Sequence, residues 1–292
     1  MFFKKKNLFW GLFVILLVVF VFFYLIPAFR GETAVFSSFD IGGFQLRIYS
    51  LALLLAVLAG YLAGRKYFGA GILKPSEWEN LILLDLLAGI LGARIHHVLS
   101  DWSYYSQRPL EIFLTWRGGL GFFGGLIGAA LATYWYSRRK KIGFFELADR
   151  LSLALPLAHA IGRWGNFFNQ EAYGLPTSLP WRMYVAPEYR LDNYSQFDFF
   201  HPVFLYESLW NLLVFFLLLQ FAKWGYLRNP GKIFGWYLVF YAVGRFFIEG
   251  LRADVSLFFG LPLNRILSFA AAVFGAFLLY RAGIRRSPKI SG

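Results

Sequence analysis

The sequence has 292 residues, of which 58% are hydrophobic, 21% aromatic and only 15% charged, and its mean hydropathy is +0.53. This composition is typical of an integral membrane protein, so the formal net charge of +13 indicates basic loops beside anionic lipid and excludes nucleic acid as the expected partner. The sequence contains no cysteine, which excludes a cysteine nucleophile and a zinc–thiolate site. Any thiol in its chemistry must therefore come from a substrate.

Apolar stretches long enough to cross a bilayer core, about 20 residues each, recur along the chain. They predict an all-α fold, a polytopic membrane helical bundle of eight transmembrane helices, at residues 8–29, 47–68, 80–99, 118–137, 147–166, 203–224, 233–251 and 262–281. The first stretch follows a lysine cluster, Lys4 to Lys6, and no A-x-A cleavage site comes after it. We therefore expect a retained anchor whose N-terminus lies in the cytoplasm.

Basic residues set the expected orientation of the bundle. They are denser in the loops assigned to the inner side, such as Arg138 to Lys141, than in the outer loops. Both termini are then cytoplasmic, and Arg163 lies on the outer side. We expect an anchor and outer linker at 1–45, a membrane domain at 46–282 that includes a small outer head at 167–202, and a basic cytoplasmic tail at 283–292.

Glycines are concentrated between Gly118 and Gly128. The pairs Gly121/Gly125 and Gly124/Gly128 have the small-xxx-small spacing that lets helices approach closely. The same glycines would also permit an irregular backbone around a ligand. The sequence leaves both interpretations open, with close packing favoured.

Four arginines lie at the outer ends of predicted spans, where an unpaired charge is costly and usually functional. They are Arg94, Arg163, Arg245 and Arg252. Guanidinium groups offer paired donors that suit a phosphate. Alternatively, some of them only neutralise acidic residues, and the candidates are Glu171, Glu207 and Glu249, of which Glu249 shares a helix face with Arg245. Glu207 could pair an arginine or accept a proton, and the sequence does not separate those roles.

Several motifs follow one another in a family's order. They are Tyr49, Gly-Ala-Arg94, Trp116-Arg-Gly-Gly, Gly-Gly-Leu-Ile-Gly128, Gly162-Arg-Trp-Gly-Asn-Phe-Phe-Asn169, His201-Pro with Tyr206-Glu207, Arg245 to Glu249, and Arg265-Ile-Leu-Ser. Over residues 45–282 the chain resembles the prolipoprotein diacylglyceryl transferase family. The Gly-Arg-x-Gly-Asn-x-x-Asn element is the most specific of these motifs.

The resemblance implies a transferase of bacterial lipoprotein biosynthesis. The family moves the diacylglyceryl group of phosphatidylglycerol onto the thiol of a lipobox cysteine in a preprolipoprotein, forming a thioether and releasing glycerol phosphate. It works at the periplasmic leaflet of the bacterial inner membrane without a metal or organic cofactor. The implied partners are phosphatidylglycerol, lipobox signal peptides and membrane lipid, with lateral access between helices.

The resemblance and the charge pattern together give the expected site. We expect Arg163 and Arg245 to bind the phosphate and act in catalysis together with Glu249 and, as proton acceptor, His97. Further phosphatidylglycerol-binding residues are expected at Tyr49, Arg94, Asn166, Asn169, Glu171, Gly174 and Arg252.

One position departs from the family pattern. Phe123 stands where the family carries His or Tyr, and phenylalanine can neither donate nor accept a proton. The neighbouring His96 and His97 are candidate replacements, with His97 slightly favoured, and His159 is a further candidate. The alternative is an altered paralogue that binds phospholipid or signal peptide, or that uses a different acceptor. A transporter or channel is disfavoured because no internal repeat is visible.

Overall fold

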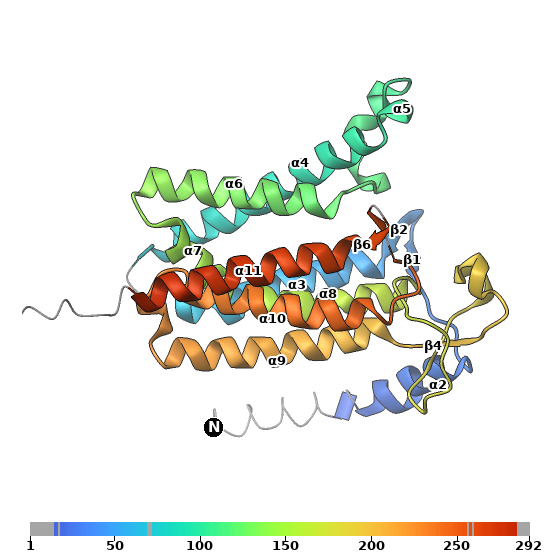
Figure 1. Ribbon diagram of the computed structural model, residues 1–292. Helices are drawn as coiled ribbons and strands as arrows, with labels where there is room; N and C mark the ends of the chain where they lie inside the picture. Colours follow the sequence, from blue (N-terminus) through green and yellow to red (C-terminus); the bar gives the residue numbers. More distant parts are fainter. Residues whose placement is uncertain (1–14, 17, 69–71, 256, 259, 285–292) are drawn as a thin grey trace, which may run out of the picture. The chain divides into compact units, whose positions relative to one another are not determined.

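The computed structural model describes residues 15–16, 18–68, 72–255, 257–258 and 260–284, and these are mostly helical (Figure 1). The long helices are α3 (Ile48–Phe68), α4 (Pro75–Ser100), α6 (Phe122–Lys140), α8 (Leu155–Phe168), α9 (Val203–Lys223), α10 (Lys232–Glu249) and α11 (Leu263–Ile284). By length and composition, α4, α9, α11 and residues 48–65 of α3 are apolar enough to cross a membrane. The predicted helical membrane class is confirmed at this level.

The stretch predicted as one span at 147–166 is instead two helices. α7 (Phe144–Leu151) ends before a short turn, and α8 begins at Leu155. Pro156 explains the break, because proline lacks a backbone N–H and disfavours helical geometry in the residue before it. A proline in the first turn of the new helix costs little, since that N–H would be unpaired in any case.

The predicted anchor at 8–29 is described only in part, because residues 1–14 and 17 lie outside the described residues. Its C-terminal end is the π-helix η1 (Val21–Leu25) followed by α2 (Ile26–Arg30), which closes on Gly31 with φ of 76°. Ala28 of α2 is buried among Phe167, Phe200 and Phe204. This apolar cluster connects the end of the anchor to the ends of α8 and α9.

The contacts divide the chain into two compact units. The first comprises residues 1–60, 156–217 and 238–274, and the second comprises 61–155, 218–237 and 275–292. The first unit holds three two-stranded antiparallel sheets: β1 (Ser38–Ile41) with β2 (Phe44–Arg47), β3 (Met183–Tyr184) with β4 (Phe199–Phe200), and β5 (Leu257–Phe258) with β6 (Leu261–Pro262). It also contains the short helices η4 (Pro187–Tyr189) and η5 (Asp192–Tyr194).

In the second unit, α4 and α6 run side by side with their backbones in contact (Figure 1). A Cβ added to Gly124 would lie 2.2 Å from the carbonyl oxygen of Gly92, and one added to Gly128 would lie 2.2 Å from that of Ala88. The favoured interpretation of these glycines, close helix packing, is therefore confirmed. The unit also contains α5 (Trp102–Tyr105) and the 3₁₀ turns η2 (Pro109–Phe113), η3 (Thr115–Arg117) and η6 (Tyr226–Arg228).

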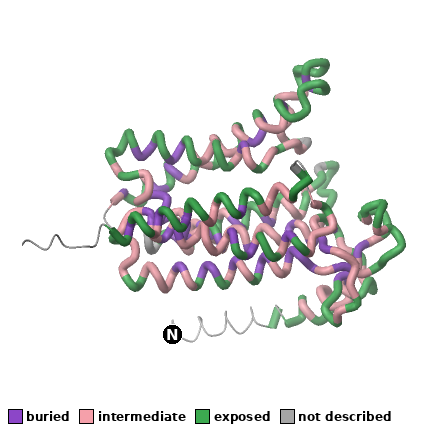
Figure 2. Tube along the Cα trace, in the orientation of Figure 1, coloured by how far each residue is buried: buried purple, intermediate pink, exposed green. Residues whose placement is uncertain are grey.

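Large apolar side chains remain exposed along the helices, whereas buried positions recur along α9 and in the segment before it (Figure 2). Leu54 of α3, Leu83 of α4 and Phe269 of α11 are each more than half exposed. Apolar surface of this extent is not found on ordinary soluble monomers, but it suits helices whose solvent is lipid.

Candidate functional site

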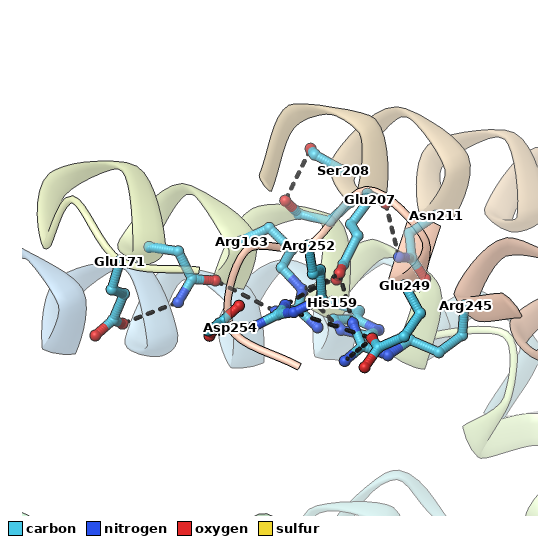
Figure 3. Close-up of polar contacts among 12 residues, drawn as sticks. His159, Arg163, Glu171, Glu207, Ser208, Asn211, Arg245, Glu249, Arg252 and Asp254 are labelled. Carbon is cyan, nitrogen blue, oxygen red and sulfur yellow. Dashed lines mark hydrogen bonds and ion pairs between the residues drawn. The ribbon is translucent and has the colours of Figure 1, made fainter. Parts of the chain in front are cut away.

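Three arginines from separate segments of the first unit converge on the carboxylate of Glu207 (Figure 3). Glu207 lies in the second turn of α9 and is 4% exposed. The Nε of Arg163, from α8, contacts its Oε2. On Oε1, the Nη1 atoms of Arg245 (α10) and Arg252 lie at 2.6 and 3.7 Å. Glu207 is thus an acidic centre that fixes the positions of the arginines.

A second buried carboxylate, Glu249, holds the other side of the cluster. Its Oε2 lies 2.9 Å from Nη2 of Arg245, which confirms the predicted pairing of these two residues on one face of α10. Its Oε1 accepts a hydrogen bond of 2.9 Å from Nδ2 of Asn264 in α11. Arg252 has a further partner, because its Nη2 donates to Oδ2 of Asp254 at 2.7 Å.

The positive and negative charges of the cluster balance. Its three guanidinium groups, from Arg163, Arg245 and Arg252, face the carboxylates of Glu207, Glu249 and Asp254. The predicted alternative, that some arginines pair with acidic residues, therefore holds for all three. These ion pairs do not use all the N–H donors of the arginines, because each guanidinium has five donors and a carboxylate accepts from one or two of them. The remaining donors can bind an anion without leaving a buried charge uncompensated.

His159 lies inside this network, one helical turn before Arg163. Its Nε2 accepts a hydrogen bond of 3.2 Å from Nε of Arg163, and its ring stacks on Tyr241. The accepting lone pair of the imidazole is therefore already used. His159 is better placed to orient Arg163 than to take a proton from a substrate.

The specific motif of α8 leads from the arginines toward the segment at 167–202. Nη1 of Arg163 lies 3.4 Å from Oδ1 of Asn166, and Nδ2 of Asn166 donates to Oε1 of Glu171 at 2.9 Å. Asn169 donates to the same oxygen at 3.3 Å. The ring of Tyr49 packs on Gly165, where an added Cβ would lie 2.5 Å from it. Asn166 thus connects Arg163 to Glu171, which Asn169 also contacts, and Tyr49 packs against the same motif.

Gly174 positions the turn that carries Arg252. The two residues form an isolated antiparallel bridge, and the N–H of Gly174 donates to the carbonyl of His201 at 2.9 Å. A Cβ at Gly174 would lie 2.6 Å from both Cβ of His201 and the carbonyl oxygen of Leu251. Only glycine fits this crossing of three segments.

Arg94 belongs to the second unit and has a different set of partners. Its guanidinium donates to the backbone carbonyls of Glu111, Ile112, Gly118 and Gly119, and it lies over the ring of Tyr105. Four of its five donors are therefore used to hold the loop between α4 and α6. These contacts favour a positioning role for Arg94 over the phosphate contact expected from the sequence.

The two adjacent histidines of α4 differ in their surroundings. The ring of His97 packs edge-on against Tyr105 and over Gly119. The ring of His96 faces Phe123 edge-on, and its Nδ1 is buried without a hydrogen-bond partner among the described residues. The ring of His96 therefore lies beside the position where the family pattern has a polar side chain, and its Nδ1 lies against Gly121.

Sequence reasoning did not assign two members of the site. Glu207 was left open between pairing an arginine and accepting a proton, and its three ion pairs now support the first role. Asn264 was missed, although its position beside the Arg265 motif was a usable signal. Within the part of the chain that the structure describes, no group of three or more His, Asp or Glu residues is arranged to hold a metal ion.

The fold and the apolar helices define a helical membrane protein that contains a buried arginine–carboxylate cluster. Comparison with known sequences then gives the family: the profile described as "Prolipoprotein diacylglyceryl transferase" matches residues 37–281. The chain belongs to the prolipoprotein diacylglyceryl transferase family.

Individual members of this family can be aligned with most or nearly all of the chain. The phosphatidylglycerol–prolipoprotein diacylglyceryl transferase of Fervidobacterium nodosum is 42% identical, covering 97% of this chain and 99% of the relative. The protein of the same name from Thermotoga maritima is 41% identical over 91% of this chain and 92% of its own length. The protein of the same name from Trichormus variabilis is 38% identical over 85% of this chain and 90% of its own length.

Proposed function

We propose that this protein transfers the diacylglyceryl group of phosphatidylglycerol to the cysteine thiol of a preprolipoprotein lipobox. It is a membrane transferase of lipoprotein biosynthesis. The observation that carries the proposal is the convergence of Arg163, Arg245 and Arg252 on one buried carboxylate in a chain of this family. Such a cluster suits the phosphate that must leave the lipid.

The reaction breaks the bond between a glyceryl carbon and a phosphate oxygen. The thiolate sulfur of the substrate cysteine forms a new bond to that carbon, and the electron pair of the broken bond stays on the oxygen of the departing glycerol phosphate. Negative charge therefore grows on the phosphate in the transition state. Donors of Arg163 and Arg245 that are not used by Glu207 and Glu249 would stabilise this charge, and they are already held in place before reaction.

The attacking group reacts as thiolate, so its proton needs an acceptor. We propose an imidazole of the α4 pair for this role. The sequence slightly favours His97, and the ring of His96 lies edge-on to Phe123, where the family pattern has a polar side chain. Comparing His96→Gln with His97→Gln separates them: the variant that loses transfer near neutral pH but recovers at high pH, where thiols ionise unaided, identifies the acceptor.

An apolar groove beside the arginine cluster suits the lipid's acyl chain. It has a volume of about 640 Å³ and is lined by residues of α9 and α10 together with Leu251. Three of its lining residues, Trp210, Gly244 and Ile248, also line the small cavity that contains His159, Glu207 and Arg245. A lipid with its phosphate at the arginines could therefore lay a chain in this groove and approach from the bilayer.

The membrane arrangement proposed for this activity follows the charge pattern. The distribution of basic residues puts both termini in the cytoplasm and the head at 167–202 outside, so that the arginine cluster faces the outer leaflet of a bacterial inner membrane. The anchor at 1–45, the membrane domain at 46–282 and the tail at 283–292 are part of the same proposal. No cofactor is needed for the displacement described.

A second candidate function rests on Phe123, which lacks the proton-transfer group of the family pattern. It is an altered paralogue that binds phospholipid or signal peptide, or that modifies another acceptor. One assay separates the two. The purified protein is incubated with phosphatidylglycerol and a lipobox peptide, and mass spectrometry follows the peptide while glycerol phosphate release is measured. A thioether-linked diacylglyceryl peptide, formed with equal release, supports transfer, and a peptide left unmodified by protein that binds both substrates supports the alternative.

A further inference from the structure

A polar pocket of about 500 Å³ lies in the first unit, beside the arginine cluster. Most of its lining side chains can form hydrogen bonds, in contrast to the apolar groove between α9 and α10. It is lined by Ser37, Ser38, Gln45, Arg47, Asn169, Gln170, Glu171, Ala172, Tyr173, Tyr189, Leu191 and Asp254. Acyl chains do not suit such a lining, whereas a small hydroxylated molecule does.

The pocket receives both outer ends of the arginine network. One path runs from Arg163 through Asn166 to Glu171, and the other runs from Arg252 to Asp254 (Figure 3). Glu171 uses Oε1 for its two amide donors, and Asp254 uses Oδ2 for Arg252. Within the described residues, the other oxygen of each carboxylate carries no intramolecular hydrogen bond and remains available.

The backbone around Glu171 is held in an unfavourable conformation. Gln170 and Ala172, its two neighbours, have φ of 49° and 54°, in the left-handed region that non-glycine residues rarely adopt. The buried side chain of Gln170 fixes the turn by accepting a hydrogen bond of 2.7 Å from the N–H of Ala186. Strain of this kind persists where the surrounding structure maintains it, and it clusters at ligand-binding sites.

We infer that this pocket binds the terminal glycerol of the lipid headgroup, and that the departing glycerol phosphate leaves through it. The inference rests on the proposed transfer and adds a headgroup subsite to it. Vicinal hydroxyls of glycerol are donors that suit the free oxygens of Glu171 and Asp254, while the phosphate stays at the arginine cluster. Arg47 also lines the pocket and supplies a positive charge there, toward which the doubly charged product is drawn after the bond breaks.

Two substitutions in the pocket lining test the subsite without changing a residue of the arginine cluster. Arg47→Gln removes the positive charge, and Tyr189→Phe removes only a hydroxyl from the lining. Arg182→Gln is the matched control, because Arg182 lies over the ring of Phe199 in the same head and does not line the pocket. Steady-state transfer is measured with varied phosphatidylglycerol at saturating peptide, and inhibition is measured with free glycerol phosphate and with inorganic phosphate.

The double variant should raise the KM for phosphatidylglycerol about tenfold, as expected for losing one or two hydrogen bonds to a bound ligand, with kcat within about twofold of wild type. Inhibition by glycerol phosphate should also weaken about tenfold, whereas inhibition by inorganic phosphate should stay unchanged. Unchanged KM and inhibition in the double variant would overturn the inference. A raised KM for the peptide alone would also overturn it and would assign the pocket to the acceptor chain.

A binding measurement separates this inference from the proposed reaction. Free glycerol phosphate should raise the Tm of the wild-type protein and of Arg182→Gln, but not that of the Arg47→Gln/Tyr189→Phe variant. If wild type shows this shift but transfers no lipid, the pocket stands and the proposed function fails. If the wild-type protein transfers lipid and glycerol phosphate raises the Tm of all the variants equally, the pocket assignment fails.

Discussion

Arg245 connects the two buried acids of the site, with Nη1 at 2.6 Å from Glu207 and Nη2 at 2.9 Å from Glu249. Glu207 comes from α9, whereas Arg245 and Glu249 share α10. One planar guanidinium therefore fixes the relative position of two helices and of the arginines that Glu207 also holds. Changes at this point should affect stability and transfer together, whereas changes at Arg163 should mainly affect transfer.

Arg163→Lys should keep the positive charge and lose the paired donors. We expect kcat/KM for lipid transfer to fall by about 10²–10³, the usual effect of removing one donor that stabilises transition-state charge. In Arg163→Ala, kcat/KM should fall by at least the same factor. Transfer is measured as thioether formation on a lipobox peptide, with Arg182→Gln as the control. Wild-type rates in Arg163→Ala would refute the phosphate-binding role.

Glu207→Gln should destabilise the protein, because it leaves buried guanidinium groups without their counter-charge. Breaking a buried ion pair on one side costs about 3–5 kcal/mol. Removing both partners, in Glu207→Gln/Arg245→Gln, should restore part of that loss. Unfolding of the four proteins in the same detergent gives the coupling free energy of the pair. Strictly additive effects would show that the contact contributes nothing to stability.

Gly174→Ala should displace the turn that carries Arg252. The new Cβ would meet Cβ of His201 and the carbonyl oxygen of Leu251 at 2.6 Å, and the latter belongs to backbone that cannot rotate away. We expect lower Tm and a large loss of transfer. Gly283→Ala is the control, since a Cβ there has no heavy atom within 4 Å. Equal activity in the two variants would contradict the crossing described for Gly174.

His201 should make the segment at 167–202 less stable in acid. Burial lowers the pKa of His201 from its ordinary value of 6.5, and its Nδ1 lies 3.1 Å from the hydroxyl of Tyr206. The unfolded chain then binds a proton more readily than the folded one, so stability present above pH 6.5 is lost as the pH falls through that value toward the folded pKa. The Tm of wild type should drop over this range more than that of His201→Gln. Parallel curves for the two proteins would exclude His201 as the cause.

Local patterns in the sequence predict a good part of this protein. The spacing of Arg245 and Glu249 places them on one helix face, and the small-xxx-small spacing of Gly124 and Gly128 predicts a close helix contact, for which the structure supplies Gly92 and Ala88 as partners. The break before α8 was missed although Pro156 signals it. The prediction failed because an apolar run of span length was given more weight than the backbone restriction of proline.

Periodicity, hydropathy and residue type are local properties, and they were sufficient for the helical membrane class, the candidate arginines and the motif of α8. Only the tertiary structure decided which acid each arginine meets, that Arg94 holds a loop, and that Asn264 supports Glu249. The reason is that these partners are far apart in sequence: Arg163, Glu207 and Arg245 come together only when α8, α9 and α10 pack. No local pattern encodes the distance between side chains on different helices.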